Sequence, residues 1–164
     1  MTRIVILGCA GSGKTTLARR LAEQAGAPMI CLDEIWRPDW GKDDTPRFRA
    51  MMATSHAAQT WISDGNFALV TFDIRLPRAD LVIWLDRSRL ACALRAATRV
   101  LQPGQHHRPS NLLEVLRFIW RFDRINRPRI EAARIEHGAH APVIRLRNDR
   151  EIAAFLQAWR PTSA

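Results

Sequence analysis

The residues with the clearest chemistry form the segment Gly8-Cys9-Ala10-Gly11-Ser12-Gly13-Lys14-Thr15, which fits the phosphate-binding pattern G-x-x-x-x-G-K-[ST]. Glycines let the backbone curl until successive amide N–H groups face inward, where they can hold phosphate oxygens at the positive end of a helix. Lys14 would reach the β- and γ-phosphates, and Thr15 would offer its hydroxyl to Mg²⁺. We therefore predict a site for a nucleoside triphosphate, ATP or GTP, together with Mg²⁺. The predicted nucleotide-binding residues are Gly8, Ala10, Gly11, Ser12, Gly13, Lys14, Thr15 and Thr16.

The segments on either side of this loop have the patterns that the motif requires. Residues 3–7 are a short, apolar, β-branched run, which is typical of a buried strand. Residues 16–25 carry apolar side chains at helical spacing, and the pattern stops at Gly26. A strand, a glycine-rich turn and a helix are thus predicted in the order that a phosphate-binding loop needs.

Two aspartates follow predicted strands at the sheet edge where ligands bind in α/β proteins. Asp33 comes after a strand over residues 28–32. It is a candidate to contact the phosphate acceptor or a Mg²⁺-bound water, and a helix cap or a solvated turn is the alternative. Asp64 comes after a strand over residues 60–63, and a carboxylate there suits the orientation of metal-bound water. We predict Thr15 and Asp64 as the metal-site residues.

Two tryptophans, Trp36 and Trp40, lie on either side of Pro38 in the loop after Asp33. They could form the floor of an acceptor pocket by stacking against a ring, and we name both as candidate substrate residues. They could equally pack the loop against the body of the protein. The sequence leaves both interpretations open.

Strand-like and helix-like segments alternate along the whole chain. Five strands are predicted to end at about residues 7, 32, 64, 85 and 146. This alternation favours a parallel sheet with right-handed crossovers, covered on both faces. Residues 68–80 are too irregular for an assignment, and Asn126-Arg127-Pro128 is predicted to interrupt a helix.

Two later helices have predicted buried sides. The first follows Ser88, its predicted cap, and the second starts at Asn111. The side chains expected to be buried are Leu90, Ala93, Leu94, Ala97, Val100 and Leu101 on the first helix, and Leu112, Leu113, Leu116, Ile119 and Trp120 on the second.

Length and composition set outer limits on the class of protein. The chain has 164 residues, of which 47% are hydrophobic, and we expect one globular domain over residues 1–164. No apolar run approaches the roughly 20 residues that span a bilayer, and the first strand starts too early for a signal peptide. The three cysteines show no metal-ligand spacing, and we expect a cytoplasmic protein.

The net charge of +9 is concentrated in the second half of the chain. Residues 1–80 hold ten basic and nine acidic side chains, whereas residues 81–164 hold fifteen and seven. Arg117, Arg121 and Arg124 form a basic stripe at helical spacing. Such an excess indicates nucleic acid, a polyanionic small ligand or a solvated face.

Taken in order, these segments resemble the adenylate-kinase-like P-loop proteins known as DNA topology modulation proteins. The resemblance rests on the phosphate loop and on several later segments in matching order. Those segments are Leu32-Asp33 with Trp36 and Trp40, residues 61–67 (WISDGNF), Asp73-Ile74-Arg75-Leu76, Arg108-Pro109 and Asn126-Arg127-Pro128.

The resemblance implies a three-layer α/β/α P-loop NTPase fold of the nucleotide-kinase type, with a five-stranded parallel sheet and a short lid at about residues 102–111. It also implies that arginines of the lid and its preceding helix close over the transferred phosphate, and Arg95, Arg99 and Arg108 occupy that region. Asn66 and Arg75 are assigned to the acceptor side. Adenylate kinases follow the aspartate–glycine pair with Phe-Pro-Arg, whereas Asn66-Phe67 stands here, so AMP is not implied as the acceptor.

Two functions from different classes remain at this point. The first is a kinase that transfers the γ-phosphoryl group of ATP to a nucleotide, a nucleoside or another small acceptor, with Lys14 stabilising the developing charge. Asp33 would be the general base if the acceptor is a hydroxyl. The second is a nucleotide-dependent regulator that binds nucleic acid, supported by the basic second half although no nucleic-acid-binding motif is present.

Overall fold

The central sheet holds five parallel strands in the order β2-β3-β1-β4-β5. The structure, a computed structural model, describes residues 2–37, 39–100 and 112–161. The strands are β1 (Thr2–Gly8), β2 (Met29–Cys31), β3 (Thr60–Asp64), β4 (Leu81–Leu85) and β5 (Val143–Leu146). The five predicted strands are confirmed, because buried parallel strands are continuous apolar runs that stand out in a sequence.

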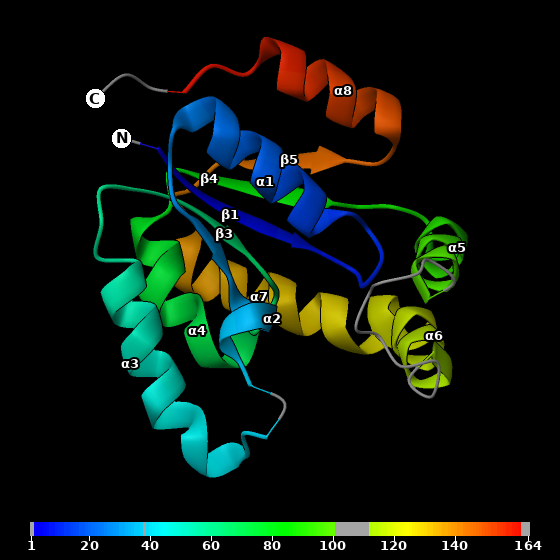
Figure 1. The fold of residues 1–164 in the computed structure, drawn as a ribbon, viewed down its shortest axis with the longest axis horizontal. Helices are drawn as coiled ribbons and strands as arrows, with labels where there is room; N and C mark the ends of the chain where they lie inside the picture. Colours follow the sequence, from blue (N-terminus) through cyan, green and yellow to red (C-terminus); the bar gives the residue numbers. More distant parts are fainter. Residues whose placement is uncertain (1, 38, 101–111, 162–164) are drawn as a thin grey trace.

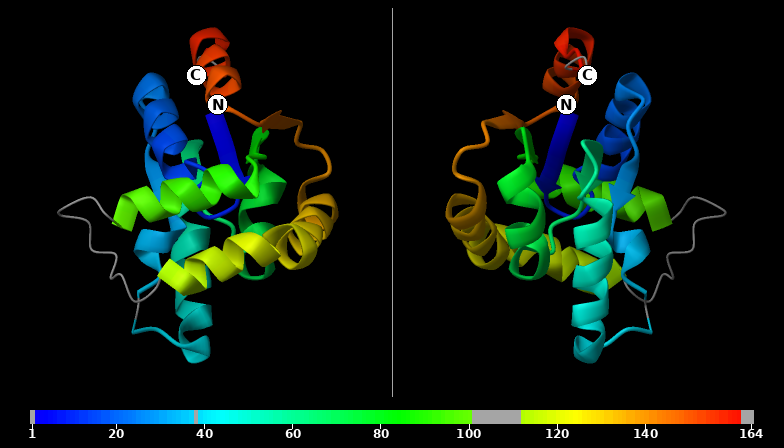
Figure 2. Two further views of the ribbon diagram at one scale, coloured as in Figure 1. Left: turned by 90° about the vertical axis from the view of Figure 1, so that its right-hand side faces the viewer. Right: turned by 90° about the vertical axis from the view of Figure 1, so that its left-hand side faces the viewer.

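Helices cover both faces of this sheet and make three layers (Figure 1). One face carries α1 (Lys14–Ala25) and α8 (Asp149–Ala158), and the other carries α3 (Thr45–Ser55), α4 (Ala68–Arg75) and α7 (Arg127–Gly138). Helices α5 (Arg89–Val100) and α6 (Leu112–Arg121) pack against each other at one end of the molecule (Figures 1 and 2). The short elements are α2 (Leu32–Ile35), η1 (Lys42–Asp44), η2 (Leu76–Arg78) and the π-turn η4 (Phe122–Asn126).

Alternate residues of β1 build the two halves of the core. Ile4 and Ile6 face α1 and α8, where they pack with Leu17 and Leu21. Val5 and Leu7 face the other side, where Trp61, Phe72 and Trp84 are buried. Because β1 is central and buried on both faces, the loop that follows it starts from a rigid strand.

Helix boundaries follow local signals in several places. Gly26 ends α1 in a left-handed conformation (φ 58°), and the Asn148 side chain accepts a hydrogen bond of 2.9 Å from the Glu151 amide at the start of α8. The Ala91 amide donates to the Ser88 hydroxyl at 3.3 Å, as expected for the predicted cap. The helix is interrupted at the π-turn η4 (Phe122–Asn126), which lies mostly before the predicted residues 126–128. Arg127 and Pro128 form the first turn of α7.

The sequence-based prediction of the buried side is wrong for α5 and only partly right for α6, where Ile119 is buried as predicted. Leu90 and Leu94 are 74% and 67% exposed, and Leu113 and Trp120 are 67% and 61% exposed. The side of α5 that faces the body carries the small buried residues Cys92 and Ala96 instead. A Cβ built on Gly11 would lie 2.3 Å from the Cys92 carbonyl oxygen, so α5 approaches the phosphate loop too closely for large side chains.

The structure assigns one segment that the sequence left open, and the predicted lid falls outside the described residues. The segment over residues 68–80 is mostly helical, as α4 and η2. The predicted lid at residues 102–111, with Arg108, and the cap at Asn111 lie outside the described residues. None of the described helices combines the length and apolar character that a membrane crossing requires.

Matched leucine substitutions on two helices test this packing. Leu17→Ala on α1, where the side chain is 2% exposed, should lower the free energy of unfolding by about 2–5 kcal/mol because it leaves a cavity. Leu90→Ala on α5 should change it by no more than about 0.5 kcal/mol. Urea denaturation of both variants checks the difference, and equal losses would contradict the exposure of Leu90.

Candidate functional site

The phosphate-binding loop joins β1 to α1 and is closed by its own backbone. Gly13 precedes α1 with φ 94°, a left-handed conformation that favours glycine, and its carbonyl accepts the Leu17 amide at 3.0 Å. The Ser12 amide donates to the Cys9 carbonyl at 3.2 Å. The ammonium of Lys14 donates to the same Cys9 carbonyl at 3.1 Å, which holds it over the loop.

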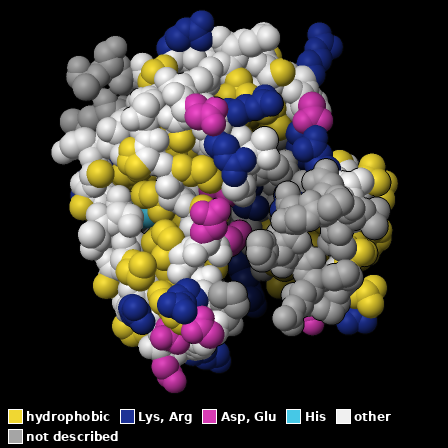
Figure 3. Space-filling model, in the orientation of Figure 1, with side chains coloured by type: hydrophobic (Ala, Val, Ile, Leu, Met, Phe, Trp, Pro, Cys, Tyr) yellow, Lys and Arg dark blue, Asp and Glu magenta, His cyan; other side chains and the backbone are white. Residues whose placement is uncertain are grey.

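A cavity of about 500 Å³ opens beside this loop. Figure 3 shows the molecule hollowed between its main body and the part that carries α5 and α6, with basic side chains in the hollow. The cavity is lined by Ala10, Gly11, Gly13, Lys14, Thr15, Asp33, Asn66, Phe67, Val70, Arg99, Phe118, Asn126, Arg129 and Ile130. Basic and acidic groups therefore face one space that also has an apolar wall.

Asp64 lies under the start of α1 and contacts Thr15. The Thr15 hydroxyl donates to Asp64 Oδ2 at 2.5 Å. The carboxyl is fully buried, and this burial raises its pKa, against the opposing effects of the Lys14 charge and the Thr15 hydrogen bond. A buried carboxyl with a raised pKa is costly to ionise unless a cation lies nearby.

Two buried polar atoms at this point fit a bound nucleotide and its metal ion. Within the described part of the chain, Ser12 Oγ and Asp64 Oδ1 have no hydrogen-bond partner although both are buried. A hydroxyl in a curled loop at a helix N-terminus suits a phosphate oxygen, and a free carboxylate oxygen beside Thr15 suits Mg²⁺ or its water. The residues present thus fit the predicted nucleotide and Mg²⁺.

Asn66 connects the phosphate loop to the end of β3. Its side-chain Nδ2 donates to the Gly8 carbonyl at 2.9 Å, and the Gly8 amide donates back to Asn66 Oδ1 at 3.3 Å. The side-chain amide thereby acts as one more rung of the β1–β3 ladder. Asn66, predicted as a substrate residue, lines the cavity and also fixes the first residue of the loop.

The acceptor side of the cavity contains Asp33, which is exposed on the short helix α2 directly after β2. Its carboxylate lines the same cavity as Lys14 and Thr15. An exposed carboxylate can accept a proton or a hydrogen bond from a bound hydroxyl. Asp33 therefore stays a candidate for the role that the sequence suggested.

The far wall of the cavity is basic. Arg99 on α5 lines the cavity, as expected of an arginine that faces the transferred phosphate. Asn126 and Arg129 also line it, and the sequence analysis did not assign them to the site. Pro128 at the start of α7 was the available signal, because a proline in the first turn fixes where a helix begins and so places Arg129 in that turn.

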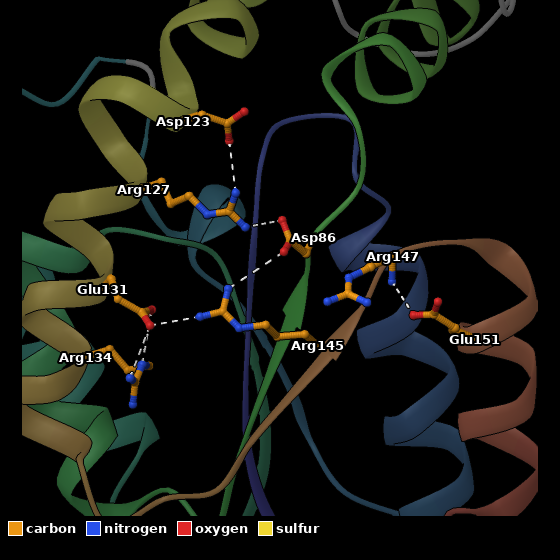
Figure 4. Close-up of polar contacts among 8 residues, drawn as sticks. All are labelled: Asp86, Asp123, Arg127, Glu131, Arg134, Arg145, Arg147 and Glu151. Carbon is orange, nitrogen blue, oxygen red and sulfur yellow. Dashed lines mark hydrogen bonds and ion pairs between the residues drawn. The ribbon is translucent and has the colours of Figure 1, made fainter.

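A chain of ion pairs of alternating sign holds α7 against the sheet (Figure 4). Arg127 pairs with Asp86 at the end of β4 and with Asp123 on η4. Arg145 on β5 pairs with Asp86 and, at 2.9 Å, with Glu131 on α7. Because Arg127 lies between Asn126 and Arg129, these contacts fix the part of α7 that reaches the cavity.

Arg95 lies on the opposite side of the phosphate loop from this cavity. It pairs with Asp149 of α8 at 2.7 Å, and Arg87 pairs with the same carboxylate. A second cavity of about 230 Å³ is found there, lined by Ser12, Gly13, Thr16, Leu17, Arg20, Arg87, Arg95, Asp149, Ile152 and Leu156. Arg95 and Thr16 thus share a space next to the loop but not the space that holds Asp33.

Two of the candidate substrate assignments need correction. Trp36 and Trp40 do not line the cavity; they pack edge to face at 5.8 Å, and Trp36 packs on Phe48 and Phe67 at 5.2 and 5.9 Å. The interpretation in which they pack the loop against the body fits this arrangement. Phe67, which the sequence analysis did not select, is the aromatic side chain that reaches the cavity from this cluster.

Arg75 is also wrong as a substrate-contacting residue. Its side chain is completely buried and donates to backbone carbonyls behind the site. A guanidinium that is already held by protein oxygens and shielded from solvent cannot touch a bound acceptor.

A phosphate loop at the end of the central strand of a five-stranded parallel sheet, with a cavity between the loop and a basic wall, defines a P-loop phosphotransferase. Residues 3–94 match the model of the AAA domain family, and the chain belongs to that family.

Known kinases are similar to this chain in sequence and in fold. A shikimate kinase from Corynebacterium efficiens is 33% identical over 135 residues, which cover 70% of this chain and 78% of that protein. An adenylate kinase from Mycobacterium leprae is 33% identical over 85 residues, which cover 49% and 42% of the two chains. The structure of a shikimate kinase from Acinetobacter baumannii in complex with shikimate has a TM-score of 0.57 and 21% identity over 96% of this chain and 89% of that chain. The predicted fold class is confirmed by these similarities.

Replacing Asp64 tests the environment of its carboxyl. Because the folded-state pKa of Asp64 is raised above 3.8, folding stabilises the protonated carboxyl relative to the ionised one. This contribution to stability is complete below pH 3.8 and is lost as pH rises through the raised pKa. Asp64→Asn should therefore be as stable as the unaltered protein or more so at pH 7, while Mg²⁺-dependent nucleotide binding weakens. Thermal unfolding with pH and calorimetry check both; a variant that is less stable at pH 7 than at pH 4, relative to the unaltered protein, contradicts the assignment.

Proposed function

We propose that this protein is an ATP- and Mg²⁺-dependent kinase that phosphorylates a small hydroxyl-bearing acceptor bound beside Asp33. The observation that supports the proposal is the shared cavity. Lys14 and Thr15 face the same space as Asp33, with Arg99 and Arg129 on the opposite wall. Phosphoryl transfer needs these groups: cations around the transferred phosphoryl and a carboxylate near the attacking oxygen.

Each residue has a defined role in this proposal. Lys14 stabilises the charge that develops on the transferred phosphoryl oxygens, and Arg99 and Arg129 neutralise it from the other side. Thr15 and Asp64 would hold Mg²⁺, which would supply further neutralisation of phosphate charge. Asp33 accepts the proton of the acceptor hydroxyl.

The cavity lining supports a small, hydroxylated and anionic acceptor. Asp33 provides an oxygen for a hydroxyl, Arg129 provides a cation for an anionic group, and Phe67, Val70 and Ile130 provide apolar contact. The similar proteins include shikimate kinases, which are named for a hydroxylated acid. Small hydroxylated acids are therefore the first acceptors to test, followed by nucleosides and nucleoside monophosphates.

The triphosphate would follow the loop from this cavity toward the second one. Ser12 and Gly13 border the second cavity, and Arg95 and Thr16 lie in it, so the nucleoside part would be bound near Arg95. We further propose that residues 1–164 work as one unit, and that the segment joining α5 to α6 carries Arg108 as a lid.

A nucleotide-dependent regulator of the DNA topology modulation type is not favoured. The relatives found by sequence and by structure include shikimate kinases, an adenylate kinase and a gluconokinase. The basic stripe of Arg117, Arg121 and Arg124 is exposed on α6 and η4. Exposure is equally expected of a stripe that only contacts solvent, so it does not support nucleic-acid binding.

Lysine substitutions test the proposed phosphoryl transfer. Lys14→Ala should lower the rate of acceptor phosphorylation about 10²–10³-fold because charge stabilisation in the transition state is lost. Lys42→Ala, at the other lysine and outside the cavity, should leave the rate unchanged. The measurement is ATP-dependent product formation over a panel of hydroxylated acids, nucleosides and nucleotides.

Asp33→Asn separates the two classes of acceptor. It should lower turnover by roughly 10²–10⁴-fold with a hydroxyl acceptor, because no base remains, and much less with a phosphate acceptor, which needs none.

Near-normal turnover of Lys14→Ala on the best acceptor would falsify the kinase assignment.

A further inference from the structure

Arg75 is a fully buried arginine without a hydrogen-bonded carboxylate. Its exposed fraction is 0%, and within the described residues its guanidinium donates only to Ser63 Oγ at 3.3 Å, to the Gly65 carbonyl at 2.6 Å and to the Asn66 carbonyl. Burial lowers its pKa to about 9, so it remains charged at neutral pH. Such a group is costly to bury, and a purely packing role would be filled at lower cost by an apolar side chain.

The carbonyls that Arg75 holds belong to a strained turn. Gly65 has φ 126°, and a Cβ there would lie 2.9 Å from Leu32 Cβ, so the position requires glycine. Phe67 has φ 28° and is the single non-glycine residue of the described chain with positive φ. Strain of this kind persists only where surrounding contacts hold it. The two carbonyls that accept from Arg75 belong to Gly65 and Asn66, the residues directly before Phe67.

This turn contributes to both sides of the cavity. The Asn66 side chain makes two hydrogen bonds with Gly8, the first residue of the phosphate loop, at 2.9 and 3.3 Å. The Phe67 ring lines the cavity together with Asp33. One guanidinium therefore holds the backbone that aims one side chain at the nucleotide loop and the next at the acceptor side.

A second buried pair fixes the guanidinium from behind. His56 Nδ1 donates to the Met52 carbonyl at 2.8 Å, and in the neutral ring Nε2 accepts from the Ser63 hydroxyl at 2.9 Å. The Ser63 oxygen in turn accepts from Arg75. Burial lowers the pKa of His56 to about 4, so the ring is neutral and does not repel the guanidinium. The aromatic face of Phe72 lies 4.9 Å from the guanidinium carbon. Arg75 is thus held in one position from α3, α4 and β3.

We propose that Arg75 is a positioning residue for the phosphate loop, acting through the Gly65–Asn66 backbone and the Asn66–Gly8 hydrogen bonds. The proposal rests on the proposed function for its nucleotide readout, since it assumes that Mg²⁺ and ATP bind at the loop. It gives Arg75 a role in the site without contact to any ligand.

The experiment compares arginine substitutions within one short stretch of the chain. Arg75→Lys keeps a charge but offers one nitrogen where Arg75 uses two, Nη1 for Ser63 and Nη2 for the two carbonyls, and Arg75→Met removes the donors. Arg78→Met is the matched control, because Arg78 donates at 2.8 Å to the Ala57 carbonyl, away from the site. Two quantities are measured on the full chain: amide hydrogen exchange at Gly8 without ligand, and binding of a non-hydrolysable ATP analogue with Mg²⁺ by calorimetry.

Arg75→Lys should raise the Kd of the analogue roughly 10-fold, within the 10–100-fold range of groups that position a ligand-binding shell, and should speed exchange at Gly8. Arg78→Met should change neither the Kd nor the exchange rate at Gly8, even if it lowers the thermal unfolding temperature as much as Arg75→Lys does. Asn66→Ala should weaken binding similarly, and Arg75→Lys combined with Asn66→Ala should be no worse than the weaker-binding single variant. Additive losses, or unchanged exchange at Gly8 in Arg75→Lys, overturn the proposal.

The two failures can be told apart. If the unaltered protein binds no analogue, the proposed function is wrong, while exchange at Gly8 still decides the role of Arg75. If Arg75→Met does not fold, the test rests on Arg75→Lys, on Asn66→Ala and on the variant that combines the two substitutions. If Arg75→Lys binds the analogue as the unaltered protein does, the proposal is wrong although the protein is a kinase.

Discussion

The central position of β1 is the constraint on which the site depends. β1 pairs with β3 on one side and β4 on the other, and the register places Ile6 beside Asp64 and Gly8 beside Leu85. The loop after β1 therefore emerges between the carboxyl ends of two neighbours, at the point where the strand order reverses. Ligands bind at this point in open parallel sheets, because the two adjoining crossovers run to opposite faces.

Polar side chains at the ends of those neighbours then hold the loop and the cavity wall. At the end of β3, Asp64 accepts a hydrogen bond from the Thr15 hydroxyl. Just beyond the strand, the Asn66 side chain donates a hydrogen bond to the Gly8 carbonyl. From β4, Asp86 pairs with Arg127 at the start of α7. The strand order thus places a carboxyl group on each side of the loop: Asp64 is hydrogen-bonded to Thr15, and Asp86 is paired with Arg127 beside the basic wall.

Much of this arrangement was predictable from residue types. The strands could be predicted because they are apolar and continuous, and the loop because its glycines and lysine form a known pattern. The buried side of α5 could not, since Leu90 and Leu94 have the helical spacing of a core face. The tight approach of α5 to Gly11 decides in favour of Cys92 and Ala96, and periodicity does not reveal such distances.

Arg75 and the segment over residues 68–80 show a second limit. The helix α4 buries Thr71, Phe72 and Arg75, so the polarity of its residues does not mark its inner side. Charged residues are seldom buried, and a sequence-based prediction places an arginine in solvent or against a ligand. Arg129 was missed for another reason: Pro128 places it in the first turn of a helix, but nothing in the local sequence shows that this turn faces the cavity.

Several arginines pair with carboxylates that lie far away in the sequence. Arg3 pairs with Asp80, Arg49 with Asp73, and Arg87 and Arg95 both pair with Asp149. These pairs join segments that are far apart in the sequence. These arginines therefore act as connections between elements, whereas the net charge of +9 is carried by basic side chains in excess of the carboxylates.

The strand order also bears on the order in which the chain is made. Both neighbours of β1 are complete when residue 85 has been synthesised, whereas β5, Arg129 and Asp149 come from the last third of the chain. On the ribosome, the segments that hold the phosphate loop precede those that supply its basic wall and the partner of Arg95. A nascent chain stalled midway would contain the loop and both adjoining strands, but not the enclosed cavity that phosphoryl transfer requires.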